Sequence, residues 1–535
     1  MAILNNPTHL TKRTFLICGS LIVLLAIFLR IHNISQRSIW LDEAIAANIS
    51  RGSLIDTLTL TRALHSAPVT HPLILFVVEK LSTEPFAVRA PSLLASVLAV
   101  CSMFLFALVP GVSSRIALLS AFLLCVSASQ IHYAQEVREY SLSVLFAALL
   151  LYLFLALASS TTPSNNSSVR MNLALFAAPL IQYGLVLFCS AILIAMFFLA
   201  LKNGEWKKRI ARTIVAAASF GVGCVLSYFL TLRYQWGDNI WYLQDSFPVS
   251  VSDIPHFIWW NSRKIISFLL PGPEAALISV IAIAIYLLYL FRTRLLTPLF
   301  VLVFCSFGIV LIFAIAHRYP FGPIRQCLFL APVMCLFAST SIVHLLDFVP
   351  YKTARAVSFV VVLSIIGVSS VVRTRSDSTY AQIEDIHPIL FELNKRVLQS
   401  DQVYVYSGAV PAVDFYDKGH EPNFIYGDFH RQDPEKYIPE LNANSIPNAT
   451  RTWIVFSHVY QDEDQMILRR LNADWEVLTI AKSKGTALYL GNRRMTRGGI
   501  SREDDGGHGA DASPSARSAD SFKDWAIRNN DRRIQ

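Results

Sequence analysis

Long apolar stretches recur through the first 375 residues of this 535-residue chain, and they constrain its fold more than any other feature. Hydrophobic residues make up 54% of the sequence and charged residues only 16%. A run of about 20 apolar residues is long enough for a helix to cross the hydrocarbon core of a membrane. The pattern therefore predicts a polytopic α-helical membrane protein.

The net charge of +9 does not indicate nucleic-acid binding. Much of the positive excess lies in short loops between the apolar runs, where membrane proteins carry Lys and Arg. We expect membrane lipids, and no nucleic acid, around the chain. Eleven segments are predicted to span the membrane: 14–32, 88–110, 114–130, 139–158, 171–184, 185–201, 209–231, 275–291, 296–316, 324–347 and 354–372.

The stretch from residue 171 to 201 fits either one long helix or a hairpin of two short helices. The strongest basic cluster between spans follows it and belongs in the cytoplasm. One long helix would place that cluster outside, so a hairpin that turns near residues 182–184 is preferred. The cluster consists of Lys202, Lys207, Lys208, Arg209 and Arg212. With the hairpin, basic residues of other short loops also face the cytoplasm: Arg115, Arg170, Arg292, Arg294, Lys352 and Arg355.

The charge pattern also predicts the orientation and the domains. Lys12 and Arg13 precede the first span, so the N-terminus is expected in the cytoplasm. Residues 1–375 then form a membrane domain with an outer loop at 33–87. Residues 376–490 are expected to form a small α/β domain outside the cytoplasm, and the polar, Gly-rich residues 491–535 a disordered tail. In the α/β domain, strands are predicted at 403–406, 453–456, 475–481 and 486–490, with a helix at 463–471.

Two adjacent carboxylates, Asp42 and Glu43, follow the first span on the predicted outer side. They could be ordinary solvated loop charges, or acids in the first turn of an interfacial helix. A catalytic pair is the third interpretation, because a positioned carboxylate can remove a proton from an acceptor hydroxyl.

Further ionisable and polar residues lie at the predicted outer ends of the apolar helices. Arginine is unexpected on this side, so Arg138 and Arg325 suggest a site that holds a phosphate. Arg89 has an equally good explanation as a side chain that snorkels to headgroups. The candidate substrate-binding residues are His71, Arg138, Tyr140, Arg318 and Arg325.

Four short motifs follow one another on the predicted outer side: Trp40-Leu41-Asp42-Glu43, His71-Pro72, Arg89-Ala90-Pro91-Ser92 and Tyr133-Ala134-Gln135-Glu136-Val137-Arg138-Glu139-Tyr140. Their order resembles the membrane-embedded GT-C glycosyltransferases, and bacterial relatives of glycosyltransferase family 39 in particular. That group includes protein O-mannosyltransferases and aminoarabinose transferases. The resemblance implies a GT-C-like membrane domain with an outer C-terminal domain, in a bacterial inner membrane.

The resemblance also implies an activity. A sugar would pass from a polyprenyl-phosphate donor to a lipid, polysaccharide or protein acceptor on the outer face. Asp42 would be the general base, with Glu43 supporting it or orienting the acceptor. Arg138, and Arg325 with it, would neutralise the departing phosphate. Relatives differ in their use of a divalent metal, and no ligand spacing in the sequence demands one.

Two other functions are compatible with many membrane spans. A transporter or flippase should show internal repeats or paired broken helices, and the sequence shows neither. A non-catalytic assembly protein on a GT-C-like scaffold stays open, since a fold does not fix a function. If the protein is an enzyme, we expect the domain at 376–490 to serve acceptor use and to be dispensable for the chemical step.

Overall fold

The computed structural model describes residues 10–160, 164–201, 206–235, 241–376, 384–417, 423–428, 430, 436, 451–472, 475–493 and 522–533. The chain divides into two compact units. The helical unit comprises Met1–Ile34 and Ser66–Ala381, and the sheet unit comprises Ser35–His65 and Gln382–Gln535. Each unit is therefore built from two separate stretches of sequence.

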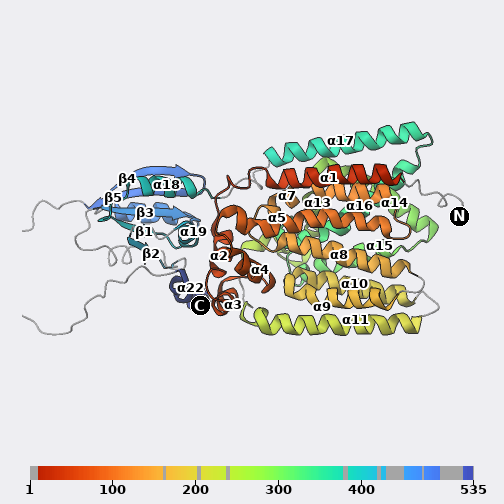
Figure 1. Ribbon diagram of the computed structural model, residues 1–535, viewed down its shortest axis with the longest axis horizontal. Helices are drawn as coiled ribbons and strands as arrows, with labels where there is room; N and C mark the ends of the chain where they lie inside the picture. Colours follow the sequence, from red (N-terminus) through yellow and green to blue (C-terminus); the bar gives the residue numbers. More distant parts are fainter. Residues whose placement is uncertain are drawn as a thin grey trace, which may run out of the picture. The chain divides into compact units, whose positions relative to one another are not determined.

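The helical unit is a bundle of long helices joined by short turns (Figure 1). Its α-helices are α1 (Lys12–Ile31), α4 (Thr70–Glu79), α5 (Pro85–Ser102), α6 (Ser114–Val126), α7 (Ala128–Ala134), α8 (Tyr140–Ser159), α9 (Asn165–Ile181), α10 (Gly184–Leu201), α11 (Trp206–Ser227), α12 (Arg233–Gln235), α13 (Ile254–Leu269), α14 (Pro273–Thr293), α15 (Pro298–Ile315), α16 (Ala331–Asp347) and α17 (Lys352–Ser376). The shorter helical turns are η1 (Met103–Leu108), η2 (Tyr228–Leu232), η3 (Trp241–Ser246), η4 (Val251–Asp253) and η5 (Arg325–Leu330).

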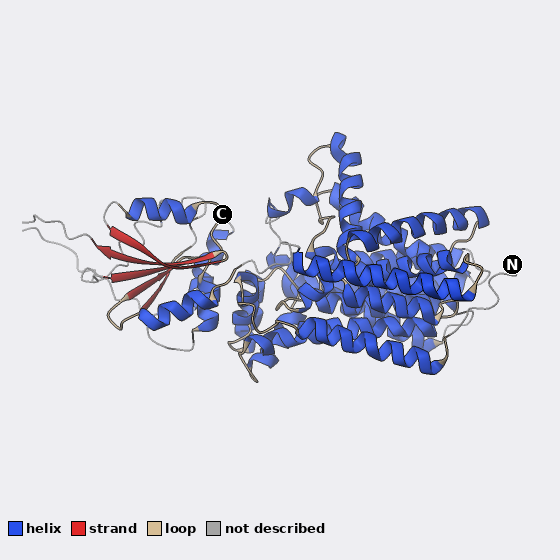
Figure 2. Ribbon diagram, turned by 90° about the horizontal axis from the view of Figure 1, so that it is seen from above, coloured by secondary structure: helices blue, strands red, loops and turns tan. Residues whose placement is uncertain are grey.

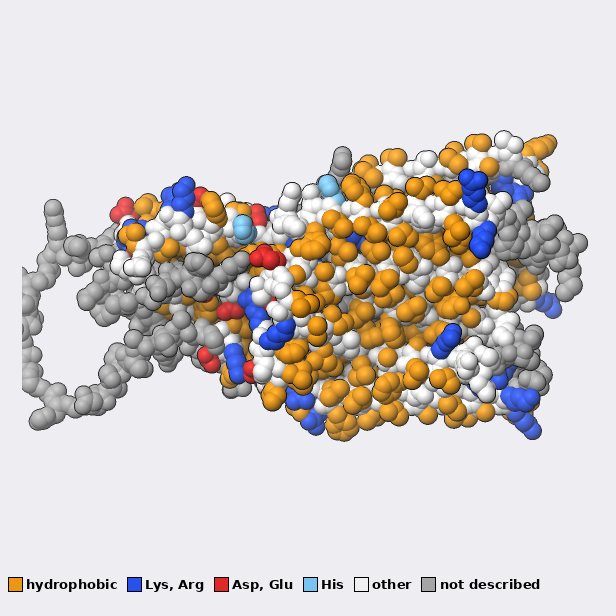
Figure 3. Space-filling model, viewed as in Figure 1, with side chains coloured by type: hydrophobic (Ala, Val, Ile, Leu, Met, Phe, Trp, Pro, Cys, Tyr) orange, Lys and Arg blue, Asp and Glu red, His pale blue; other side chains and the backbone are white. Residues whose placement is uncertain are grey.

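The bundle is that of a multi-pass membrane protein. Within the described residues, nine helices are long and apolar enough to cross a membrane. The pair α6 and α7, bent by 60° at its break, makes a tenth if it is counted as one span. The remaining predicted span, 171–184, coincides with α9, which has 17 residues. Hydrophobic side chains cover the sides of the bundle, and charged ones gather toward its ends (Figure 3).

The predicted hairpin is confirmed. Helix α9 ends at Ile181 and α10 begins at Gly184, so the chain turns where the loop charges required it. Another feature agrees with the predicted loop positions. Asp347 at the end of α16 accepts ion pairs from Arg115 at 3.0 Å and from Arg355 at 3.2 Å, which puts both arginines at one end of the bundle. The compartment that this end faces stays a prediction.

The sheet unit contains five strands in the order β2-β1-β3-β5-β4. Strands β1 and β3 pair in parallel, as do β1 and β2, whereas β5 runs antiparallel to β3 and β4. Helices lie on both faces of the sheet (Figure 2). The strands are β1 (Gln402–Val405), β2 (Asn423–Tyr426), β3 (Arg451–Ser457), β4 (Trp475–Ser483) and β5 (Thr486–Arg493). The helices are α2 (Leu41–Ile49), α3 (Leu54–Leu64), α18 (His387–Arg396), α19 (Val410–Tyr416), α21 (Glu463–Leu471) and α22 (Phe522–Arg533).

The four predicted strands and the helix at 463–471 are present, and β2, α18 and α19 are additional elements. Two predicted boundaries differ from the structure. Residues 35–65, predicted as part of the outer loop of the membrane domain, group with the sheet unit, because α2 packs on α19 and α3 packs on α22. Within the predicted disordered tail, residues 522–533 form a helix. The rest of that tail beyond β5, residues 494–521 and 534–535, lies outside the described residues.

The tail helix α22 is held by a buried tryptophan. The side chain of Trp525 is 2% exposed, and its indole N–H donates to the carbonyl of Gly427 at 2.9 Å. Lys523 Nζ lies 2.6 Å from Asp56 Oδ1 of α3. Polar composition predicted disorder here, but one aromatic anchor and one ion pair to distant residues are enough to fix a short helix.

Candidate functional site

Two arginines and a tyrosine meet at the start of α8 in the helical unit. The guanidinium carbon of Arg138 lies 5.7 Å from the centre of the Tyr140 ring, and that of Arg325 lies 5.6 Å from it. Arg138 and Tyr140 are buried, with 7% and 3% of their surface exposed, and Arg325 is half-buried. Positive charge is thus concentrated around one aromatic ring, an arrangement suited to an anionic group.

Local structure explains how Arg138 reaches this place. The chain bends between α6 and α7, and His132 Nε2 lies 3.0 Å from Glu136 Oε1 one turn later. The segment that follows is too tightly turned for a helix, with the Arg138 N–H donating to the Glu136 carbonyl at 2.9 Å. Ser92 Oγ of α5 donates to the Arg138 carbonyl at 2.8 Å. The backbone on both sides of the arginine side chain is therefore fixed.

The same segment is tied to the end of α1. Gln135 Nε2 donates to the carbonyls of Arg30 and His32, at 3.1 and 2.9 Å. Arg89 of α5 donates to the Ile34 carbonyl at 2.7 Å and is fully buried. Arg89 therefore does not snorkel, because its guanidinium satisfies a backbone carbonyl inside the helical unit.

A histidine and a glutamate are part of the same cluster. His71 of α4 and Glu139 are both 2% exposed, and a ring nitrogen of His71 lies within 4.8 Å of a carboxylate oxygen of Glu139. Burial, with Arg138 nearby, lowers the pKa of His71 to about 3, so its ring is neutral at physiological pH. Arg138 Nε lies 3.8 Å from Glu139 Oε2. A neutral imidazole beside these charges can hydrogen-bond a substrate hydroxyl or phosphate.

The turn between α9 and α10 packs against the loop that carries Arg325. A side chain on Gly184 would collide with the Tyr319 hydroxyl, at 2.3 Å, so the close contact requires glycine. Tyr319 donates to the Gln326 carbonyl at 2.7 Å, next to Arg325. Burial raises the pKa of Tyr319 well above its ordinary value, which keeps it a neutral hydrogen-bond donor. The predicted hairpin thus supports the loop that carries Arg325.

The remaining predicted substrate residue lies elsewhere. Arg318 is exposed, and its N–H donates to the Phe313 carbonyl at 2.8 Å, where α15 ends. Its side chain extends from a helix terminus to solvent, whereas Arg325 opens the turn that leads to α16. Of the five predicted substrate residues, the structure therefore brings together His71, Arg138, Tyr140 and Arg325, but not Arg318.

The acidic pair belongs to the sheet unit. Asp42 and Glu43 occupy the first turn of α2, where carboxylates are favoured by the helix dipole. Asp42 is half-buried, and Glu43 is 1% exposed. Neither side chain is an ordinary solvated loop charge.

The start of α2 is held by the segment that precedes α18. Ser38 Oγ donates to Asp385 Oδ1 at 2.6 Å, and the Leu41 N–H donates to Glu384 Oε2 at 3.4 Å. The Ile39 N–H donates to the Tyr416 hydroxyl at 2.8 Å. The residue that caps the helix, Trp40, makes no side-chain capping bond, so the cap comes from a residue more than 300 positions away.

The other end of α2 is fixed on α19. Asn48 Nδ2 donates to the Pro411 carbonyl at 2.8 Å. Arg51 donates to the carbonyls of Asp414 and Phe415, at 3.1 and 2.9 Å, with its guanidinium 4.6 Å from the centre of the Phe415 ring. Both ends of the acidic helix are thus attached to the C-terminal part of the chain.

Solved structures share this architecture. ArnT from Cupriavidus metallidurans in the apo state superposes with a TM-score of 0.56 at 12% sequence identity, over 90% of this chain and 98% of that chain. The same enzyme bound to undecaprenyl phosphate gives 0.55 at 12% identity over the same shares. The archaeal oligosaccharyltransferase AglB from Archaeoglobus fulgidus, in complex with an inhibitory peptide and a dolichol-phosphate, gives 0.51 at 10% identity, over 92% of this chain and 75% of that chain.

The chain therefore shares the fold of ArnT and AglB. The predicted fold class is confirmed, including the small sheet domain formed largely by the C-terminal part of the chain. No protein-family model matches the sequence, and no curated protein matches it. At 10–12% identity the likeness concerns the fold, so the activity has to be argued from the residues.

Sequence reasoning missed two contributors to the candidate sites of this fold. Glu139 appeared only as a letter in a motif, although it lies beside Arg138 and His71. Glu384 acts through a contact with Leu41, a residue far away in sequence. An acid next to an arginine at a span terminus was a usable signal for Glu139, but no local pattern marks Glu384.

Proposed function

We propose that the protein is an integral-membrane glycosyltransferase that moves a sugar from a polyprenyl-phosphate donor to an acceptor hydroxyl. The observation that carries the proposal is the buried cluster of Arg138, Tyr140 and Arg325 at the end of a membrane-spanning helix. Ionisable residues at membrane depth are costly, and such residues often mark sites that bind a substrate or an ion. The fold supports the proposal, since ArnT was solved with undecaprenyl phosphate.

The two arginines would bind the donor phosphate. A planar guanidinium bonds two phosphate oxygens at once, and it also stacks on an aromatic ring. As the bond between the anomeric carbon and the phosphate oxygen breaks, negative charge grows on the leaving polyprenyl phosphate. Arg138 and Arg325 would stabilise that charge. His71, neutral at physiological pH, would hydrogen-bond the sugar or the phosphate.

Asp42 is assigned as the general base. The acceptor hydroxyl loses its proton to the Asp42 carboxylate while its oxygen forms the new bond to the anomeric carbon. The leaving phosphate takes the electron pair of the broken bond, so no other reactant is needed. Glu43, buried on the next position of α2, would orient the acceptor or support Asp42.

A divalent metal has no step in this proposal. His71 and Glu139 of the helical unit lie within 4.8 Å of each other, and both are residue types that can bind a metal ion. The chemistry above uses only the arginines and the carboxylate.

The decisive experiment uses membranes that contain the full-length protein and a labelled polyprenyl-phosphate sugar. Asp42→Asn should lower transfer about 100-fold or more, as expected for loss of a general base, while donor binding is retained. The control is Asp253→Asn, the same chemical change at a partly exposed residue of η4, which should transfer normally. Unchanged transfer by the Asp42 variant would remove it from the mechanism. Donor transported across the membrane without transfer would instead identify a flippase.

The proposed reaction takes place on the outer face of a bacterial inner membrane. Cysteine labelling can test this, with tags at Trp206 and Arg294 reporting the cytoplasm and a tag at Asn423 reporting the outer compartment. A cytoplasmic signal from Asn423 would contradict the orientation.

A further inference from the structure

Two adjoining cavities open between helices α8, α9, α10 and α11 of the helical unit. The first has a volume of about 40 Å³ and the second of about 220 Å³; both are open on one side, and both are lined by Leu157, Met196 and Arg212. They lie where α8 and α10 end and α11 begins. Tyr140 is at the other end of α8, a helix of 20 residues, so about 30 Å separates these cavities from the arginine–tyrosine cluster.

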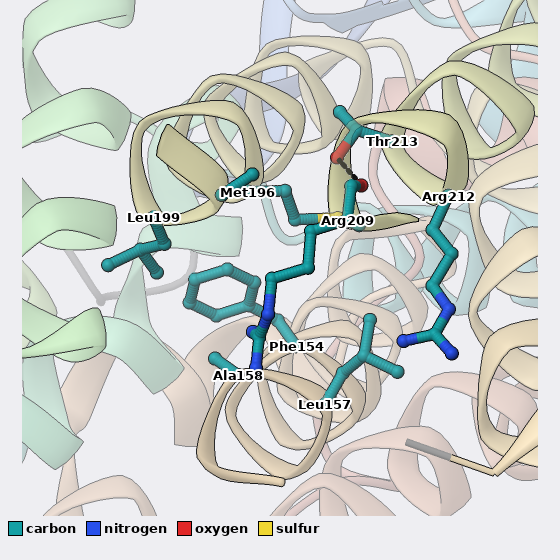
Figure 4. A pocket seen from close by; sticks show the side chains of 9 residues that line it. Phe154, Leu157, Ala158, Met196, Leu199, Arg209, Arg212 and Thr213 are labelled. Carbon is teal, nitrogen blue, oxygen red and sulfur yellow. Dashed lines mark hydrogen bonds between the residues drawn. The ribbon is translucent and has the colours of Figure 1, made fainter. Parts of the chain in front are cut away.

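Two arginines supply the charge. Arg209 and Arg212 are one turn apart on α11, and both line the first cavity (Figure 4). Arg209 reaches across to the end of α8, where it donates to the Ser160 carbonyl at 3.3 Å. Thr213 donates to the Arg209 carbonyl at 3.0 Å. No Asp or Glu is present among the described residues that line either cavity, so the charge of the lining is positive.

The rest of the first cavity is apolar, and the second adds polar groups at one side. Phe154, Leu157 and Leu199 line the first cavity beside the two arginines (Figure 4). Ser168 and Asn172 of α9 line the second. Two cationic side chains beside an apolar wall match the chemistry of a phospholipid, which has a charged headgroup and hydrocarbon chains.

We propose that these cavities bind an anionic phospholipid, with its phosphate on Arg209 and Arg212 and an acyl chain along the apolar wall. Basic pockets between membrane helices are suited to such headgroups. Arginine is the appropriate residue because its planar fork bonds phosphate oxygens in pairs. Met196, and Met171 in the second cavity, provide adaptable surfaces for a flexible chain.

A free phosphate ion does not use the apolar wall. Most of the first cavity is hydrocarbon, and only the arginines and Thr213 give it polar side chains. An ion would therefore gain the charge contacts but none of the burial. A lipid gains both, and it would link α11 to the end of α8, which otherwise meet here through the Arg209 contact.

The test is a lipid titration of the purified full-length protein in a neutral detergent, followed by native mass spectrometry. Phosphatidylglycerol should bind, and Arg209→Gln/Arg212→Gln should weaken its binding about tenfold or more, because charge-assisted contacts are lost. The control is Lys207→Gln/Lys208→Gln on the same helix. It removes the same charge from exposed side chains that line neither cavity.

A second variant keeps the result interpretable if the first fails to fold. Arg209→Lys/Arg212→Lys preserves the charge and should bind phosphatidylglycerol more weakly than the wild type, yet more tightly than the glutamine variant. If the Lys207→Gln/Lys208→Gln control lost as much phosphatidylglycerol binding, the effect would come from general surface charge, and the proposed site would be wrong. Equal binding of phosphatidylcholine, or full competition by inorganic phosphate at matched concentration, would also overturn it.

Discussion

Glu384 should control the activity assigned to Asp42, although it belongs to the C-terminal domain. Its side chain is 2% exposed and accepts from three groups: the Leu41 N–H at 3.4 Å, Ser457 Oγ at 3.1 Å and, through its second oxygen, His458 Nδ1 at 2.5 Å. Leu41 is the first residue of α2 and precedes Asp42 directly. Substitution of Glu384 therefore removes an acceptor that caps the first turn of the acidic helix.

The magnitude follows from these contacts. A buried donor that loses its acceptor costs about 1–3 kcal/mol. The long Leu41 contact belongs at the lower end of that range, like a helix cap worth about 1 kcal/mol. The short His458 contact belongs at the upper end. Glu384→Ala should thus destabilise the sheet unit by roughly 3–5 kcal/mol, because three donors lose one buried acceptor. Glu384→Gln keeps the volume and one acceptor oxygen and should cost about half as much.

The effect of Glu384→Gln on transfer kinetics should be more informative than its effect on stability. Helix α2 has nine residues, too few to be stable without its contacts. A base displaced by about 1 Å can lower the rate by up to about 100-fold. We expect Glu384→Gln to lower kcat and leave the donor KM unchanged, because the arginines proposed to bind the donor phosphate belong to the other unit.

The assay combines transfer kinetics with hydrogen exchange across residues 41–49. The matched control is Glu392→Gln on α18, where the carboxylate pairs with Arg396 near the surface and does not contact α2. Faster exchange in α2 and a lower kcat, in the Glu384 variant alone, support the reasoning. Unchanged exchange, or a higher donor KM at normal kcat, would refute it.

Three further predictions concern single side chains. Arg138→Lys should lower kcat/KM for the donor about tenfold or more, through the loss of paired charge-assisted bonds, whereas Arg318→Lys should have no effect on the same transfer assay. The wild-type helical unit should lose stability as the pH falls from about 6.5 toward 3, because His71 binds a proton in the unfolded chain but stays neutral when buried in the folded one. His71→Gln should therefore make the melting temperature less dependent on pH over this range. Trp525→Ala should destabilise the sheet unit by about 3–5 kcal/mol and speed proteolysis of α22, and Ile527→Ala, at a residue 52% exposed, should do neither.

The membrane-spanning part of the fold could be predicted because its signal is local. An apolar run of the right length becomes a helix in almost any context, since its backbone groups must be satisfied internally. The hairpin at Gln182–Gly184 needed only loop charges in addition. The strands of the sheet domain were recognisable for a similar reason, because buried strands such as β3 are continuous runs of β-branched and aromatic residues.

The roles of the buried arginines could not be predicted from position alone. Arg30 and Arg89 are both fully buried, and both donate to backbone carbonyls, of Cys125 and Ile34 among others. Arg138 differs because its guanidinium lies against an aromatic ring and beside a carboxylate. A sequence shows an arginine near a membrane surface, but its partners decide whether it is structural or binds a ligand.

The sheet unit also changes the expected role of the C-terminal domain. The chain leaves the helical unit after Ile34, forms α2 and α3, and returns at Ser66; within the sheet unit α2 packs on α19 and α3 packs on α22, which come more than 300 residues later. Contacts between segments so distant in sequence form late, since a long loop must close first. We therefore expect the acidic helix to become ordered only once the C-terminal domain has folded. The earlier expectation that residues 376–490 are dispensable for the chemical step no longer follows, because their removal would leave α2 without α19, Tyr416 and Glu384. If the proposed function is correct, an incomplete chain would keep the arginines of the helical unit but lack an ordered Asp42, so transfer would depend on completion of the fold.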